Sequence, residues 1–245
     1  MSRRDWLAVA VRLAWLKTRA GRTWTIAPAA LLAIVIFAWV RDSYGTAMKF
    51  FLSLFPYLFL FLGADMVRSE AESGALENGL FLGGKFRAYL SLKGPVLAAV
   101  AAAISLVLFA GLMLAGLAAG RPVLPDAGRF GIGLVVGAYY IALAGLLSTR
   151  LRAGSNVLVV LIVQAAAFLL VMFTLPSRAG LLAAMETGVW PDLETRLEFM
   201  AAAALIPNLV LTPPLYPFSL ELVALTIVAF IWQRAVVRRM ELGKP

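Results

Sequence analysis

Six long apolar stretches, separated by short polar ones, dominate this chain. They cover Trp24–Val40, Met48–Ala64, Pro95–Ala119, Phe130–Ser148, Asn156–Leu175 and Leu220–Gln233. Each is close to the roughly 20 apolar residues that a helix needs to cross a lipid bilayer. Because lipid offers the backbone no hydrogen-bond partners, such stretches cross it as helices. The pattern therefore predicts an all-α, polytopic membrane protein with six transmembrane helices.

Two further segments are partly apolar but do not match a span. Residues 1–22 place tryptophan and leucine among arginines and lysines at helical spacing, which is typical of an amphipathic helix at the membrane interface. Residues 177–217 combine Trp190 with a helical pattern over Leu193–Leu205 and then several prolines. This second segment is too apolar for a free loop and too broken for a span. It predicts short extracytoplasmic helices between the fifth and sixth spans.

Composition agrees with a membrane location for the whole chain. Hydrophobic residues make up 62% of the 245 residues and charged residues 14%, whereas a soluble domain has roughly half and a quarter. Such a chain cannot cover a folded surface with polar side chains. We therefore expect residues 1–245 to form one transmembrane domain in contact with the lipid bilayer.

The basic residues fall unequally on the two sides that six spans define. Of the 22 lysines and arginines, most lie on the side that also holds both termini. Because cytoplasmic loops carry the excess of basic residues, both termini are expected in the cytoplasm, with the chain in the cell (inner) membrane. The net charge of +9 then reflects topology rather than nucleic-acid binding. The basic residues on the opposite side are Arg41, Lys49, Arg121, Arg129, Arg178 and Arg196.

The sequence contains neither cysteine nor histidine. This excludes disulfides, thiolate or imidazole metal sites, and Ser-His or Cys-His catalytic pairs. The clustered carboxylates Asp65, Glu70, Glu72 and Glu77 have a spacing that matches no hydrolase or transferase pattern. We therefore expect no enzymatic activity, no metal site and no cofactor on this chain.

The connection between the second and third spans, residues 65–94, carries most of the polar chemistry. It runs from an acidic stretch through Gly74, which permits a sharp turn, to a short predicted helix over Ala75–Leu82. Leu76 and Leu80 share one face of that helix. A helix this short is not stable alone, so it must be held by the membrane domain or by a soluble protein that docks from the cytoplasm.

The stretch Glu70-Ala-Glu72-Ser-Gly74-Ala-Leu76-Glu77 resembles a motif of the permease subunits of type 2 ABC exporters, the ABC-2 family. In that family the second helix ends in a pattern close to E-x-E-x-G-T-L-E-x-L, and a lysine opens the third helix, where this chain has Lys93. Ala75 replaces the usual threonine, and Asn78-Gly79 replaces an apolar pair. The amphipathic start and the broken outer segment also resemble the family's connecting helix and extracellular helices.

The resemblance implies a permease subunit of an ATP-driven exporter that works by alternating access. Residues 65–94 would be its cytoplasmic coupling loop, docking on a nucleotide-binding subunit. Two ABC ATPase subunits and a second permease, identical or related, would be its partners, and ATP and Mg²⁺ would be bound by the ATPase. The residues that the resemblance assigns to coupling are Glu70, Glu72, Gly74, Leu76, Glu77 and Leu80.

A partial phosphate-binding motif overlaps this loop. Gly79–Phe86 fits most of G-x-x-x-x-G-K-[ST], yet Phe86 replaces the hydroxyl that would hold Mg²⁺ and no strand precedes the glycines. ATP binding by this chain is therefore not expected, and the energy would come from a separate chain.

Polar and small residues inside the spans predict helix contacts. Gln164 lies near the middle of the fifth span, where an amide should hydrogen-bond another helix or contact cargo. Pro56 predicts a kink in the second span. The pairs Gly116/Gly120 and Gly133/Gly137 predict close helix packing. As a hypothesis, a lipid-like or amphipathic cargo would pass along the permease dimer interface, lined by the second and fifth spans.

Two other classes of protein compete with the exporter interpretation. A secondary transporter would need paired broken helices and intramembrane charges, which the pattern does not show. A membrane scaffold or assembly factor would need no ATPase partner, and the sequence leaves it open.

Overall fold

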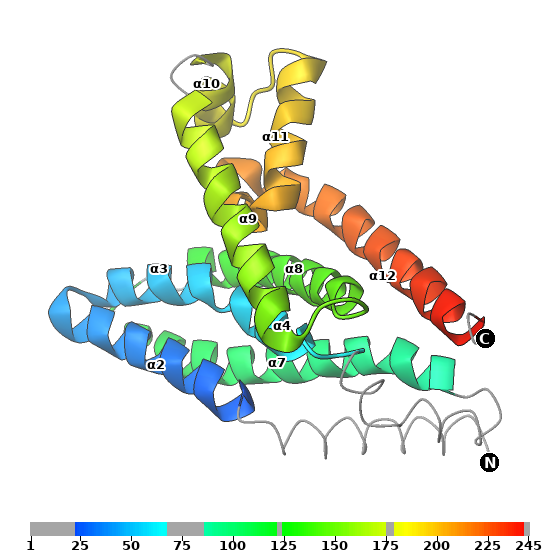
Figure 1. Cartoon of the computed structure of the whole chain (residues 1–245). Coiled ribbons are helices and arrows are strands. Elements are labelled where there is room, and N and C mark those ends of the chain that lie inside the picture. The colour runs from blue at the N-terminus through cyan, green and yellow to red at the C-terminus, as the bar shows by residue number, and fades with distance from the viewer. Residues whose placement is uncertain (1–22, 68–85, 122–123, 175–178, 243–245) are drawn as a thin grey trace.

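The computed structural model describes residues 23–67, 86–121, 124–174 and 179–242. These residues form helices and short connections, without a strand in the described part (Figure 1). In chain order the α-helices are α2 (Thr23–Arg41), α3 (Tyr44–Leu54), α4 (Pro56–Gly63), α7 (Phe86–Ala118), α8 (Leu124–Leu147), α9 (Ala153–Thr174), α10 (Ala179–Thr187), α11 (Leu193–Leu205) and α12 (Ser219–Leu242). Two 3₁₀ helices, η2 (Pro207–Leu211) and η3 (Pro213–Phe218), precede α12.

Five helical stretches are long and apolar enough to cross a membrane. They are Tyr44–Gly63, Lys93–Ala118, Ala127–Leu147, Gly154–Phe173 and Pro213–Val236. The chain is therefore an all-α, polytopic membrane protein by helix length and hydropathy. The first predicted span corresponds to α2, whose apolar part, Thr25–Arg41, is shorter than these five.

The second span is divided at Pro56, as the sequence predicts. The Phe55 N–H still reaches the Phe51 carbonyl oxygen at 2.9 Å, but proline has no N–H to continue the ladder. After the proline, the Leu58 N–H donates to the Phe55 carbonyl oxygen, three residues earlier, at 3.0 Å. This hydrogen bond spans one residue fewer than the regular α-helical one. α3 therefore ends at Leu54 and α4 begins at Pro56.

The third span begins earlier than the sequence predicts. Helix α7 begins at Phe86, before Lys93 and Pro95, and runs for 33 residues. Pro95 is thus inside the helix rather than at its start. Membrane helices tolerate an internal proline because neighbouring groups satisfy the backbone that it frees.

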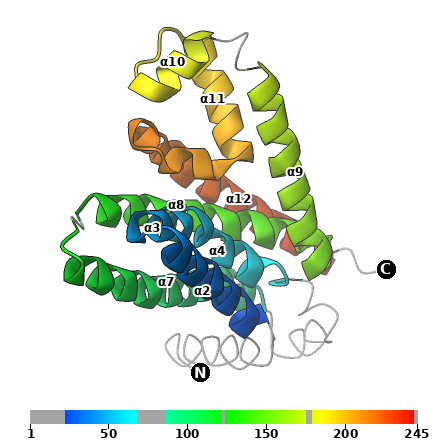
Figure 2. The same ribbon diagram turned by 90° about the vertical axis from the view of Figure 1, so that its left-hand side faces the viewer.

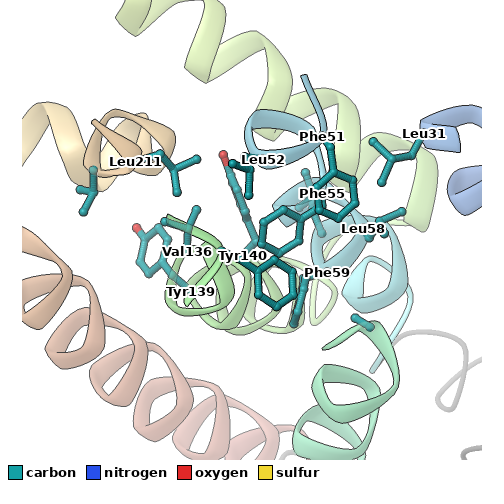
Figure 3. Packing of buried hydrophobic residues seen from close by; sticks show 14 of the residues in the cluster. Leu31, Phe51, Leu52, Phe55, Leu58, Phe59, Val136, Tyr139, Tyr140 and Leu211 are labelled. Atoms are coloured by element: carbon teal, nitrogen blue, oxygen red, sulfur yellow. The ribbon is translucent and has the colours of Figure 1, made fainter. Parts of the chain in front are cut away.

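The core includes the aromatic side chains of Phe51, Phe55 and Phe59, which lie together in Figure 3. Two of these rings pack against glycines of α8. Phe55 lies against Gly133 and Phe59 against Gly137 so closely that a Cβ at either glycine would overlap the ring. Both members of this glycine pair make the close contact that the sequence predicts. Gly116 of the other pair lies under Tyr44, whereas Gly120 has a φ of 67° and ends α7 instead of packing.

Helices α3–α4 and α8 form the centre of the bundle, and the other spans surround them. Just over half of each central span, 56%, is buried, compared with 22% for α9 and for α12. Figure 2 shows α2, α3, α4, α7 and α8 grouped together, while α9 starts at one end of this group and leads to α10 and α11, which stand apart from it. Apolar side chains on the outer faces of α9 and α12 fit a lipid environment.

The segment after α9 folds into the short helices that the sequence predicts for residues 177–217. Helix α11 covers Leu193–Leu205, and the prolines that follow initiate η2 and η3. Trp190 packs against both α11 and η3, with its ring centroid 4.9 Å from that of Phe199 and 4.8 Å from that of Phe218. The interfacial helix predicted over residues 1–22 lies outside the described residues, as do residues 68–85 of the predicted coupling loop.

Candidate functional site

The structure describes both ends of the predicted coupling loop but not its middle. The assigned residues Glu70, Glu72, Gly74, Leu76, Glu77 and Leu80 all lie outside the described residues. The chain before the loop ends with Asp65–Val67, directly after α4, and the chain after it begins with α7. The loop end of the bundle is defined here as the end at which α4 ends and α7 begins.

The last residues before the loop are held by side chains from two other helices. Lys93 of α7 donates from Nζ to the Met66 carbonyl oxygen at 2.8 Å, and its side chain is only 5% exposed. The Val67 N–H donates to Ser148 Oγ at 3.1 Å, and that hydroxyl donates in turn to the Gly145 carbonyl oxygen at 2.8 Å. A cation beside the carbonyl end of a helix is also favoured by the helix dipole.

A third helix joins this arrangement through Asn156. Its Nδ2 donates to the Ala64 carbonyl oxygen and to the Ala144 carbonyl oxygen, each at 2.9 Å. Asn156 is fully buried in the first turn of α9, so the two hydrogen bonds are shielded from solvent. The α4 anchor is defined as Ala64, Met66 and Val67 together with Lys93, Ser148 and Asn156.

Helix α12 packs against the same place. A Cβ at Gly145 would overlap the Met66 side chain and lie 3.0 Å from Gln233 Nε2. A Cβ at Gly94 would be 3.1 Å from the Phe230 ring. Because α7, α8 and α9 contact the end of α4, and α12 packs on α7 and α8 beside it, a displacement of this end would move the other helices as well.

Gln164 lies in a second polar group, deeper in the bundle. Tyr57 of α4 donates its hydroxyl to Gln164 Oε1 at 2.9 Å, and Gln164 Nε2 donates to the Tyr140 hydroxyl at 2.8 Å. Tyr140 donates to Asn208 Oδ1 at 3.0 Å, and Asn208 Nδ2 donates to the Ser53 carbonyl oxygen at 2.9 Å. The polar chain is defined as Tyr57, Gln164, Tyr140, Asn208 and the Ser53 carbonyl.

The polar chain connects four parts of the molecule that are distant in sequence. It begins and ends on the two sides of the Pro56 break, and it passes through α9, α8 and η2 on the way. Tyr57 and Tyr140 also stack, with ring centroids 5.1 Å apart. Gln164 is 6% exposed, and both ends of its amide are used by helices of its own chain.

No known protein family matches this sequence, and neither the curated proteins nor the solved structures contain a significant relative. The functional interpretation therefore rests on the residues and contacts of this chain. Among the described residues, no group of three or more carboxylate, histidine or cysteine side chains is arranged to hold a metal ion.

Sequence reasoning missed most residues of these two groups. The sequence pattern puts Asn156 at the edge of the fifth span, and it predicts no contact for Tyr57, Tyr140 or Asn208, which lie in apolar or proline-rich segments. A tyrosine or asparagine inside an apolar helix could have indicated them, since a buried hydroxyl or amide requires a partner. Lys49, a charged residue inside the second predicted span, is exposed and belongs to neither polar group.

Of the two spans expected to line a cargo path, α9 exposes apolar side chains on its outer face, whereas α3–α4 is mostly covered by its own bundle.

Proposed function

We propose that this chain is the membrane-spanning permease subunit of an ATP-driven, ABC-2 type exporter. ATP hydrolysis takes place on separate nucleotide-binding subunits, which also bind ATP and Mg²⁺, and this chain has no catalytic role. The observation that carries the proposal is the α4 anchor. It ties the chain just before residues 68–85 to α7, the helix that follows them, and to α8 and α9.

The α4 anchor is suited to mechanical coupling. A partner that pushed on the loop would move Met66 and Val67, and their hydrogen bonds with Lys93 and Ser148 would carry that movement into α7 and α8. Interdigitated packing of α4 with α8 allows little independent motion, so the helices would move together.

The Pro56 break gives the proposed movement a defined hinge. Helix α4 can tilt relative to α3 at Phe55, where the regular helical ladder is interrupted. The polar chain connects the two sides of this hinge through α8 and α9. Alternating access would then consist of a change in the angle between α3 and α4, accompanied by a shift of α9.

For the topology, we propose that α2 is a sixth span. Its 19 residues pack along α3, and the two helices form a hairpin that turns at Asp42 and Ser43 (Figure 1). Six spans place both termini and residues 68–85 in the cytoplasm, because the basic residues gather on that side. This orientation makes the loop accessible to a cytoplasmic ATPase.

We further propose a second permease subunit, a copy or a relative, that packs on the exposed face of α9. Leu161, Ile162 and Phe168 are among the apolar residues of that face. A lipid-like or amphipathic cargo would fit a path between two such faces. The membrane would be the cell (inner) membrane.

The test is co-purification of the tagged full chain from its native membrane, with associated ATPases identified by peptide mass spectrometry. Glu77→Gln is expected to lower the ATPase retained, and the ATP hydrolysis measured in proteoliposomes, several-fold. Glu186→Gln is the matched control, because Glu186 is an exposed carboxylate on α10, outside the predicted coupling loop. It should change neither the amount of ATPase retained nor the rate of ATP hydrolysis. Purification without an ABC ATPase, or an unchanged complex for Glu77→Gln, would count against the proposal.

A further inference from the structure

An apolar groove of about 340 Å³ lies between α11 and α12, with Phe218 of η3 in its lining. Its walls include Met200 and Ala204 of α11, Leu222, Ala224 and Leu225 of α12, and a single charged residue, Glu221. The volume is at the lower end of the range for ligand pockets, about 300–1,000 Å³. Small alanine side chains leave this space open.

Glu221 is only partly satisfied by the protein. Its Oε1 lies 3.2 Å from Arg196 Nη2, while its Oε2 is shielded from solvent and has no hydrogen-bond donor among the described residues. Glu221 lies in the first turn of α12, toward the end of the span that is opposite Arg234. A phospholipid headgroup reaches this level, and a shielded carboxylate oxygen is costly unless a ligand or partner completes its hydrogen bonds.

Arg196 is held at the edge of the same groove. Its guanidinium carbon lies 5.8 Å from the centre of the Phe218 ring, and Phe218 is in turn packed by Trp190 and Phe199. The Arg196 side chain is 52% exposed, so part of its guanidinium faces outward while one nitrogen contacts Glu221. The groove therefore combines an apolar wall with one cation and one carboxylate at fixed positions.

We propose that this groove binds a zwitterionic phospholipid of the surrounding membrane whose headgroup carries a primary ammonium. The phosphate pairs with Arg196, the ammonium donates to the Glu221 carboxylate, whose side chain is 23% exposed and lines the groove, and one acyl chain lies in the groove. An anionic lipid would satisfy Arg196 but would be repelled by Glu221. A choline headgroup has no N–H to donate, so it would leave Glu221 Oε2 without a partner.

The test uses the purified full chain in detergent, with phosphatidylethanolamine and phosphatidylcholine of identical acyl chains, and measures bound lipid by native mass spectrometry. Phosphatidylethanolamine is expected to bind about tenfold more tightly, because a hydrogen bond to a charged group is worth that ratio. Glu221→Gln should bring the ratio of the two affinities close to one. Arg196→Gln should weaken both lipids alike.

Matched variants separate the groove from the general surface. Ala224→Leu fills the groove and should weaken both lipids, whereas Ala235→Leu, at an exposed position of the same helix outside the groove, should weaken neither. For the headgroup, Glu194→Gln on exposed α11 surface is the control for Glu221→Gln. Equal binding of the two lipids to the unaltered chain, or an unchanged ratio in Glu221→Gln, would overturn the proposal. The measurement needs no ATPase, so its outcome is independent of the proposed exporter function.

Discussion

The Lys93 Nζ lies 2.8 Å from the carbonyl oxygen of Met66, in a site where the lysine is almost fully buried. This hydrogen bond joins the chain just before residues 68–85 to the helix that follows them. Lysine is rarely buried to this degree, and a buried cation requires several hydrogen-bond partners. Its position at the carbonyl end of α4 gives it a structural role in fixing both ends of the loop.

Lys93→Met keeps the length of the side chain but removes its donors. We expect the free energy of unfolding to fall by about 1–3 kcal/mol, because the Met66 carbonyl loses its partner in a buried site. Thermal unfolding of the purified chain in detergent measures this. Lys49→Met, at an exposed position of α3, is the control and should unfold at the temperature of the unaltered chain. Equal stability of the two variants would show that the Lys93 hydrogen bond is not required.

Asn156→Leu removes both hydrogen bonds that tie α9 to α4 and α8. Side-chain hydrogen bonds within membrane proteins average about 0.6 kcal/mol, so two of them predict a loss of about 1 kcal/mol or more. Equilibrium unfolding in a denaturing detergent series measures the change. The neighbouring Ser155→Ala, at an exposed position, should be neutral. A neutral Asn156→Leu would mean that α9 is held by packing alone.

A double-mutant cycle tests the polar chain. Tyr57→Phe and Gln164→Leu each remove the hydrogen bond between these residues. The losses in unfolding free energy of the two single variants should therefore add up to more than the loss in the double variant. We expect a coupling free energy of about 0.6–1.7 kcal/mol. Additive effects, with no coupling beyond error, would exclude this hydrogen bond as a source of stability.

The glycines of α8 offer a comparison within one helix. Gly137→Ala would push a methyl group into the Phe59 ring, and overpacking of this kind costs about 1–3 kcal/mol. Gly131→Ala, in the same helix but facing open space, should be neutral or stabilise by up to about 1 kcal/mol through helix propensity. Gly137→Ala should therefore unfold at a lower temperature than Gly131→Ala, and equal unfolding temperatures would contradict the close contact between Gly137 and Phe59.

Asp192 caps the start of α11, and its side chain accepts from the Thr195 N–H. This hydrogen bond holds the pKa of the Asp192 carboxyl below its usual value of 3.8. Since the folded pKa is lowered, the stabilisation is present above the unfolded pKa and is lost as the pH falls through the folded one. We expect hydrogen exchange at the start of α11, corrected for the intrinsic effect of pH, to increase only below about pH 4.

Asp192→Ala should raise that exchange at neutral pH and remove its acid dependence, because the capping oxygen is gone. Asp42→Ala, an exposed position outside α11, is the control and should leave the exchange of α11 unchanged. Retained acid dependence in Asp192→Ala would assign the effect to another group.

Sequence reasoning predicted the large-scale organisation because that organisation depends on local patterns. A membrane-length apolar run, a proline inside it and a helical pattern of apolar residues act within a few residues, so the division at Pro56 and the range of α11 could be expected in advance. The start of α7 could not, since Pro95 is a helix breaker by propensity and only its surroundings made it acceptable.

The contacts that define both polar groups depended on the tertiary structure. Lys93 and Met66 are 27 residues apart, and Tyr57 and Gln164 are 107 apart, so no periodicity connects them. The sequence by itself determined that this chain enters a membrane as several helices, because apolar length alone decides that partition. Which side chains meet inside the bundle was decided by the packing of α4 against α8, since close contact between rings and glycines fixes the helices at a single register.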